Sequence, residues 1–224
     1  VDLLSQGRFA EPVDCAVSRH LVEGSYDRII SIGQLVPHEV IGIANHNKNV
    51  YLGAGGEDII NKSHFLGAVC DMETIMGRAE TPVRALLNDV DDLFGGKIPP
   101  VTYLLTVRAR NEDGRLVTRG LFCGEGRESF LEGAQLSRQV NLDLLDRPIR
   151  KAVVYLDPDE FQSTWLGNKA IYRTRMALAE DAELIVLAPG VKSFGEDHGI
   201  DALIRCFGYC GTEETLRHVR ENSD

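Results

Sequence analysis

Two histidines and one lysine stand in the first third of the chain in a pattern that could do chemistry. His38 follows Pro37, Lys48 lies ten residues further on, and His64 lies sixteen residues after Lys48. An imidazole can transfer a proton near neutral pH or bind a metal ion. A lysine amine can form a covalent bond to a carbonyl-type group. The three side chains together indicate a covalently held, metal-bearing cofactor beside a proton-transfer base.

Each of these residues, taken alone, has an ordinary structural explanation. His38 is then a loop histidine bonded to the backbone, Lys48 a surface lysine, and His64 a packed or capping histidine. His46 could serve as a further ligand, but a loop residue is the simpler interpretation. The case for a site therefore depends on the joint spacing and on the elements that position the residues.

The expected elements place the three residues around one short strand and one helix. The β-rich run 28–33 predicts a buried strand, and the segment 34–38 then follows its carboxyl end, where open α/β sheets bind ligands. Residues 50–56 predict a second short strand that runs into a glycine turn. A helix is expected from Glu57 to Gly77, with His64 about two turns from its start.

The glycine turn Gly53-Ala54-Gly55-Gly56 has two interpretations. A glycine turn before a helix can bind a phosphate through free backbone N–H groups. It can also simply reverse the chain, and this is favoured because Glu57 and Asp58 would repel a phosphate placed there. The turn has neither the lysine and hydroxyl of a P-loop nor a complete dinucleotide-binding pattern.

The remainder of the chain alternates between strands and helices. This order predicts an α/β protein of two lobes, each a sheet flanked by helices. Residues 1–145 are expected to form the cofactor-binding and catalytic lobe, and residues 146–224 a C-terminal α/β lobe. The further expected helices cover 81–90, 128–140, 161–180, 200–207 and 213–222, and the further expected strands cover 101–107, 116–122, 152–156 and 183–189.

Composition limits the possible partners and the compartment. A net charge of −10 argues against general nucleic-acid binding, which needs a basic surface. No apolar run approaches the ~20 residues that span a bilayer, and no signal peptide is visible. Five cysteines without regular spacing favour a reducing cytoplasm. Cys206 and Cys210 form a lone C-x3-C pair and are expected to be buried or half-buried structural thiols.

Lys169 is a further candidate in the second lobe. It follows Gly167 and Asn168 inside the expected helix 161–180, and because both are poor helix formers, a break there could expose the lysine to a cleft. A solvated helix lysine is the plainer alternative.

The segment Pro37-His38, Lys48 and His64 resembles the nickel-dependent lactate racemase family. That family has a Pro-His pair after a strand, a lysine ten residues after the histidine, and a second histidine sixteen residues after the lysine. The resemblance covers roughly residues 27–67, and a weaker one runs through Lys169 and residues 170–189.

The resemblance implies a role for each residue. Lys48 would anchor a nickel-pincer nucleotide covalently, His64 would ligate the nickel, and His38 would be one of two acid/base histidines. Lys169 would contact the carboxylate of a small 2-hydroxy acid. The implied activity is that of an isomerase, a hydroxy-acid racemase or epimerase working by hydride transfer to and from the cofactor.

Several departures from the family pattern leave alternatives open. The family's second acid/base histidine lies well upstream of the Pro-His pair, in a segment this chain does not contain, and His20 is too close to His38 to replace it. We therefore expect a fragment that is inactive alone. Asn45-His46-Asn47 stands where the family has a Gly-Gly pair, and Leu166 stands where it has a glutamine. The alternatives are a cofactor-binding relative without racemase activity and a non-enzymatic interaction domain.

Overall fold

The computed structural model describes residues 1–222 and divides them into two compact units. The first unit comprises residues 1–143, and the second begins at Leu144. Both contain small sheets with helices, so the α/β fold class expected from the sequence is confirmed.

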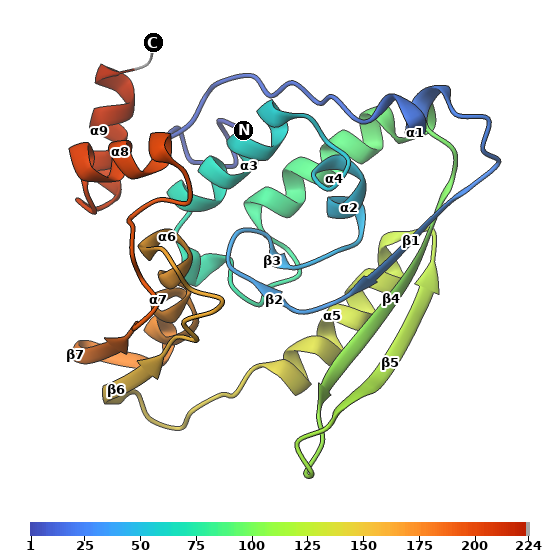
Figure 1. Ribbon diagram of the computed structural model, residues 1–224. Coiled ribbons are helices and arrows are strands. Elements are labelled where there is room, and N and C mark those ends of the chain that lie inside the picture. Colours follow the sequence, from blue (N-terminus) through green and yellow to red (C-terminus); the bar gives the residue numbers. More distant parts are fainter. Residues whose placement is uncertain (223–224) are drawn as a thin grey trace. The chain divides into compact units, whose positions relative to one another are not determined.

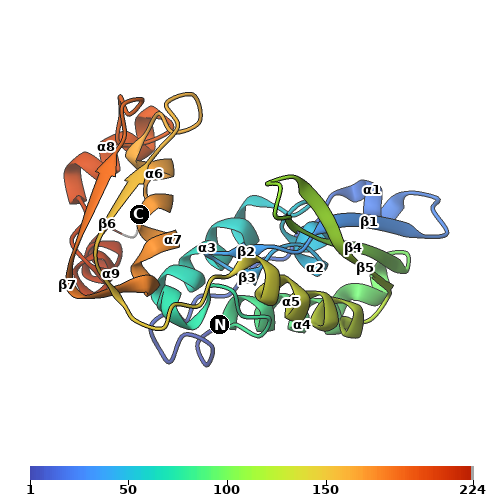
Figure 2. The ribbon, with the colours of Figure 1, turned by 90° about the horizontal axis from the view of Figure 1, so that it is seen from below.

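A three-stranded mixed sheet, in the order β1-β4-β5, organises the first unit (Figure 1). Strand β1 (Ile29–Gln34) runs parallel to β4 (Val101–Arg110), and β4 pairs antiparallel with β5 (Leu116–Gly124). Helix α5 (Arg127–Asn141) lies along one face of β4 and β5 (Figure 2). The expected strand at 28–33, the hairpin of β4 and β5 and the helix at 128–140 are therefore present. The strand is not buried as expected, because β1 lies at the edge of the sheet and leaves Ile30 and Ile32 exposed.

The core of the first unit lies between this sheet and α5. Alternate residues of β4 point to the covered face, so Tyr103, Leu105 and Val107 are buried while their neighbours are partly exposed. Phe130 and Ala134, one turn apart on α5, pack against them. Each fully buried aliphatic side chain of this kind stabilises the fold by about 1.5–3 kcal/mol.

A second layer of short elements carries the candidate residues. A two-residue hairpin pairs β2 (Pro37–His38) with β3 (Gly42–Ile43). The Oγ1 of Thr81 caps the following long helix by accepting from the N–H of Arg84, and Pro82 occupies its first position. The other elements here are α1 (Arg19–Glu23), α2 (Asn47–Tyr51), α3 (Glu57–Val69), η1 (Met72–Thr74), α4 (Pro82–Phe94) and η2 (Gly95–Lys97).

Two sequence-based expectations in this layer are wrong. Residues 50–56 do not form a strand, because α2 occupies residues 47–51 and a turn follows it. The expected helix 57–77 ends at Val69, where Cys70 leaves the helical path and Asp71 adopts a positive φ of 62°. The apolar spacing beyond residue 69 comes instead from the short helix η1 and its flanks.

The second unit contains a two-stranded parallel sheet, β6 (Ile149–Tyr155) with β7 (Leu178–Leu187). The expected helix 161–180 is wrong: Asn168 separates two short helices, and β7 begins already at Leu178. Side chains of Leu156, Phe161 and Ala170 form the core of this unit. Its helices are α6 (Thr164–Gly167), α7 (Lys169–Thr174), η3 (Arg175–Ala177), α8 (His198–Phe207) and α9 (Thr212–Glu221).

The C-x3-C pair is not buried as expected. Cys206 and Cys210 are both exposed free thiols, because α8 carries Cys206 on its outer side and Cys210 lies in the connection to α9. Over residues 1–222, no helix is both long and apolar enough to cross a membrane.

Candidate functional site

His38 lies in the β2–β3 hairpin, opposite Gly42. Its ring is partly buried, and its Nδ1 accepts a hydrogen bond of 3.1 Å from the backbone N–H of Val40. A neutral imidazole has one acceptor nitrogen and one donor nitrogen, so this bond places the hydrogen of the neutral ring on Nε2. The hairpin therefore holds the ring in one tautomer, with Nε2 as the proton-donating atom.

Lys48 lies in the first turn of α2, not before a strand as expected. Its side chain is partly buried, and within residues 1–222 its amine makes no hydrogen bond or ion pair. Burial lowers the pKa of Lys48 below its usual value, the Arg84 cation lowers it further, and the Glu39 carboxylate acts in the opposite direction. This environment increases the fraction of neutral, nucleophilic amine at a given pH.

The turn before Lys48 has a backbone that favours glycine. Asn45 has a φ of 68° and His46 a φ of 62°, in the left-handed region that non-glycine residues rarely adopt. The segment Asn45-His46-Asn47 stands where the resembled family has its glycine pair, and a positive φ is the conformation that favours glycine. The amide of Asn45 donates to the carbonyl of Gln34, and Gly33 leaves no room for a Cβ beside Asn45.

His46 lies in a loop, as expected, but its side chain is buried in the core. It is 1% exposed, and its ring centroid lies 4.0 Å from that of Tyr103 and 5.1 Å from that of Phe130. Neither ring nitrogen makes a hydrogen bond with a described group. The Gly126 backbone and the Asn47 side chain nevertheless raise the pKa of His46 and offset part of its lowering by burial. Burial, followed by the Arg84 cation, lowers the pKa of His46 to about 4. The ring is therefore neutral at physiological pH.

Arg84 is the residue that sequence reasoning missed. It lies in the first turn of α4, is 3% exposed, and donates to the carbonyl oxygens of Ile43 (2.6 Å) and Asn45 (3.2 Å) and to Oδ1 of Asn47. Its Cζ lies 4.3 Å from the centre of the Phe130 ring. The sequence distinguishes Arg84 only weakly from a solvated helix arginine, because its partners are mostly backbone oxygens some 40 residues away.

Polar side chains fix α2 along α4 and against β1. The amide of Asn47, which is 0% exposed, donates to Oδ1 of Asn88 over 2.9 Å. One turn further along both helices, the Tyr51 hydroxyl donates to Asp91 over 2.6 Å. On the side of the sheet, Asn49 donates to the Ser31 hydroxyl over 3.2 Å. Lys48 therefore stands on a short helix whose position is determined from two directions.

His64 lies on α3 and is exposed. Its Nδ1 is 2.7 Å from the carbonyl oxygen of Ile60, one turn earlier. A carbonyl oxygen only accepts, so Nδ1 carries the hydrogen and Nε2 presents a lone pair to solvent. Metal-binding histidines are commonly oriented in this way by a backbone carbonyl.

The turn of the β2–β3 hairpin lies close both to Lys48 and to the helix that carries His64. The turn that follows His38 contributes Glu39, whose charge acts on Lys48, and Val40, which packs against α3. A Cβ on Gly67, three residues after His64, would stand 3.0 Å from Val40. Figure 1 shows the hairpin below α2 and α3, and in Figure 2 it lies between them. The elements that carry His38, Lys48 and His64 are thus neighbours in the first unit.

Lys169 belongs to the second unit. It begins α7 and is partly buried. Leu166, three residues earlier, packs on the apolar core of that unit. The position at which the resembled family has a glutamine therefore serves packing here.

The glycine turn before α3 reverses the chain. The N–H of Gly56 donates to Ala16 over 2.8 Å, and the N–H of Gly55 donates to Leu52. A Cβ on Gly55 would lie 1.9 Å from the carbonyl oxygen of Tyr51, so only glycine fits. Backbone donors that are already bonded cannot cradle a phosphate, which favours chain reversal over phosphate binding.

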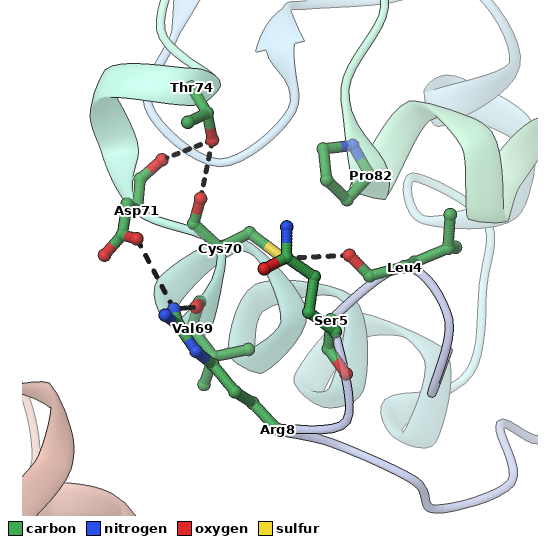
Figure 3. A pocket seen from close by; sticks show the side chains of 9 residues that line it. Leu4, Ser5, Arg8, Val69, Cys70, Asp71, Thr74 and Pro82 are labelled. Atoms are coloured by element: carbon green, nitrogen blue, oxygen red, sulfur yellow. Dashed lines mark hydrogen bonds and ion pairs between the residues drawn. The ribbon is translucent and has the colours of Figure 1, made fainter.

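A pocket of about 210 Å³ lies elsewhere in the first unit, between the N-terminal segment and the carboxyl end of α3 (Figure 3). The thiol of Cys70 donates to the carbonyl of Leu4, and Arg8 pairs with Asp71 beside it. None of the four predicted site residues lines it, and we assign it no role. Its lining residues are Leu4, Ser5, Gln6, Arg8, Val69, Cys70, Asp71, Thr74 and Pro82.

Comparison with known proteins gives a structural neighbour but no family. The sequence matches no family profile and no curated protein. A solved structure of a Thermotoga maritima protein, a structural genomics target, is similar over 100% of this chain with 26% identity and a TM-score of 0.82. The match covers 54% of the Thermotoga chain, so the 224 residues span about half of its length. The neighbour supports the α/β fold, and its description names no activity.

Proposed function

We propose that this chain carries the cofactor-binding part of a lactate-racemase-like racemase or epimerase of a 2-hydroxy acid. The observation that carries the proposal is the amine of Lys48. It is partly buried, has no hydrogen bond or ion pair within residues 1–222, and stands beside the hairpin of His38. A solvated surface lysine would be neither buried nor lowered in pKa by burial, as Lys48 is. The spacing of His38, Lys48 and His64 adds the resemblance to the nickel-dependent lactate racemase family.

The donor atoms fit a cofactor that brings most of its own metal ligands. Within residues 1–222, no group of three or more His, Cys, Asp or Glu side chains could hold a metal ion. His64 would therefore be a single protein ligand, with Nε2 facing solvent and Nδ1 held by Ile60. Imidazole nitrogen is a suitable ligand for nickel. A bound nickel-pincer nucleotide would supply the remaining sulfur ligands and the capacity to accept and return a hydride.

Lys48 would hold that group through its amine. A nucleophilic lysine must lose its proton before it attacks a carbonyl-type carbon. Burial and the nearby Arg84 cation both favour the neutral amine. The helix that carries Lys48 is fixed by Asn47 and Tyr51 on α4, which keeps the attachment point in place.

His38 would move the proton of the substrate hydroxyl. With Nδ1 accepting from Val40, the neutral ring donates from Nε2. This arrangement suits a hydrogen bond from Nε2 to an oxygen on the substrate, which would orient that oxygen. Protonating the oxygen requires the imidazolium, in which Nδ1 also carries a hydrogen and the bond from Val40 is lost. Acting as the base requires the other tautomer, and with it the loss of the bond from Val40.

Lys169 would take part in substrate recognition. The ammonium of Lys169 could contact the carboxylate of a 2-hydroxy acid, as the resemblance implies. Leu166 offers no hydrogen bond in place of the family's glutamine, because its side chain packs on the core. Sites that discriminate by hydrogen bonding lose that selectivity when the partner is removed. A larger or more apolar acid than lactate is therefore the better candidate.

Mass analysis of the protein tests the cofactor half of the proposal. The chain is co-expressed with enzymes that make the nickel-pincer nucleotide, and its intact mass and peptide map are measured. An adduct on Lys48 that is absent from Lys48→Arg and present in Lys169→Arg supports the assignment. An unmodified Lys48 in a host that loads a known racemase would overturn it.

Activity is tested separately with loaded full-length protein and a panel of chiral 2-hydroxy acids. Inversion at C2 of at least one acid, abolished in His38→Ala, supports the racemase or epimerase assignment. An adduct on Lys48 without inversion of any acid would point to a cofactor-binding relative that lacks this activity. Neither adduct nor inversion would favour an interaction domain with structural histidines.

A further inference from the structure

We propose that Arg84 is the positioning residue for Lys48, because its buried guanidinium holds together the turn from which the lysine helix starts. That Lys48 anchors a cofactor rests on the function proposed above. That Arg84 sets the position of the Lys48 amine is independent of that function. Arg84 lies 36 positions from Lys48 in the sequence, on a different helix.

The first argument is the set of acceptors around the guanidinium. Arg84 donates to Ile43, Asn45 and Asn47, which are the three alternate residues that lead from β3 into α2. A planar, forked donor group can contact several oxygens at fixed angles, whereas an ammonium cannot. The contacts of one side chain therefore define the path of the segment that ends at Lys48.

The second argument is the strained backbone of that segment. Asn45 and His46 both have a positive φ, a backbone conformation that is unfavourable for non-glycine residues. Such conformations persist only when the surroundings determine them. Arg84 supplies two hydrogen bonds to the carbonyl of Asn45, at 3.2 and 3.3 Å, within the strained pair.

The third argument is the charge of Arg84. It is 3% exposed, and within residues 1–222 no carboxylate lies within ion-pairing distance of it. A buried cation without a carboxylate is costly to the fold. Its charge is felt instead by its neighbours, and Arg84 and Glu39 are the charged groups that act on Lys48. A packing role alone does not account for an unpaired cation at this place.

Removing Arg84 should change the chemistry of Lys48 in a defined direction. Loss of the cation and loosening of the turn both raise the pKa of Lys48, because each removes a cause of its lowering. A rise of about half a unit leaves about threefold less neutral amine at pH 7.5. The amine should therefore react more slowly with an acylating reagent.

The experiment is competitive labelling of all lysines with a trace of acetic anhydride between pH 6 and 10, followed by peptide mapping. Lys62 and Lys97 serve as references within the same chain. In Arg84→Met we expect labelling of Lys48 at pH 7.5 to fall about threefold or more and its pH midpoint to rise, with a smaller change in Arg84→Lys. Arg127→Met is the matched control, because Arg127 also donates to α4 but its charge is not among those that act on Lys48.

The outcomes separate this inference from the proposed function. Unchanged labelling of Lys48 in folded Arg84→Met would overturn the inference. If Arg84→Met does not fold, Arg84→Lys decides, and labelling identical to the wild type would overturn it. The third outcome is a changed pH midpoint for labelling of Lys48 in the Arg84 variants, with no cofactor adduct on the wild-type chain. This result would support Arg84 as the positioning residue and contradict only the cofactor assignment.

Discussion

Two Asn-Lys pairs, one in each unit, show how differently the same dipeptide can be used. Asn47-Lys48 begins the five-residue helix α2, and Asn168-Lys169 lies at the start of the six-residue helix α7. Asn47 is fully buried and bonds to Arg84 and Asn88, whereas Asn168 is partly exposed and donates to the Tyr209 hydroxyl over 3.0 Å.

The difference between the pairs lies in their surroundings. The first pair follows a strained turn and stands beside a buried histidine and a buried arginine. The second follows the ordinary helical conformation of Asn168, with a φ of −58° and a ψ of −16°. Short helices have little stability of their own, so tertiary contacts decide what their side chains can do. The contacts at Lys48 favour chemistry, and those at Lys169 are compatible with a simple surface contact.

The largest expected effect is an acid sensitivity confined to the first unit. Burial lowers the pKa of His46 to about 4 in the folded chain, from the 6.5 of a solvated histidine such as the unfolded chain presents. Between these values the unfolded chain binds a proton that the folded chain does not, so stability decreases as the pH falls from 6.5 towards 4. The loss reaches roughly 3 kcal/mol at the lower end.

Urea unfolding at pH 7 and at pH 4.5, followed by the fluorescence of Trp165 for the second unit and by circular dichroism for the whole chain, measures this effect. His46→Phe keeps an aromatic ring beside Tyr103 but cannot bind a proton, so its stability should depend less on pH. An equal pH dependence in His46→Phe would show that other groups cause the acid sensitivity.

The next effect separates the two asparagines. Asn47→Ala leaves Arg84 without the Oδ1 that it donates to and Asn88 without the amide that donates to it. Because buried groups left unpaired are unfavourable, the free energy of unfolding should fall by about 1–3 kcal/mol. Asn168→Ala removes a bond to an exposed hydroxyl and should cost less than about 0.5 kcal/mol. Thermal unfolding of the two variants measures the contrast. Equal losses would show that the buried network adds little.

The expected strands and helices were recovered best where their side-chain pattern was strong. The alternation in β4 and the apolar stripe of α5 are set by burial against each other, and periodicity reports burial. The expected helix 161–180 is wrong because its apolar spacing continues into β7, whose first residues Leu178 and Ala179 are partly buried as part of a strand. Likewise, Tyr51 and Val50 have β-type side chains, but polar contacts with α4 impose a helix there.

The candidate site likewise contains residues that the sequence indicates and residues that it does not. The spacing of His38, Lys48 and His64 is visible in the sequence, as is the strand end that precedes His38. Arg84 and the burial of His46 are not, since both depend on backbone oxygens and rings that come from distant segments. A charged residue among apolar helix positions, such as Arg84 between Val83 and Leu86, gives the only local signal, and it is a weak one.

A smaller effect distinguishes Lys48 from another lysine in the same unit. The pKa of Lys62 is raised, mainly by its hydrogen bond with Asp58, whereas that of Lys48 is lowered, mainly by burial. In competitive acylation of the wild-type chain, the pH midpoint of Lys48 should lie below that of Lys62. Asp58→Asn should lower the midpoint of Lys62 and leave that of Lys48 unchanged. A midpoint for Lys48 above that of Lys62 would remove the argument for a neutral amine.

The smallest expected effect concerns two residues with a positive φ, one in each unit. Asp181 has a φ of 57° and is exposed, so Asp181→Gly relieves the backbone and should raise stability by about 0.5 kcal/mol. Asn45→Gly relieves a φ of 68° but also deletes the hydrogen bond to Gln34, so the two changes should cancel to within about 0.5 kcal/mol. Urea midpoints of the two variants, measured beside the wild type, give the comparison. If Asn45→Gly stabilises the chain as much as Asp181→Gly does, the side chain of Asn45 does not help to hold the turn, and Arg84 and the backbone hold it without that bond.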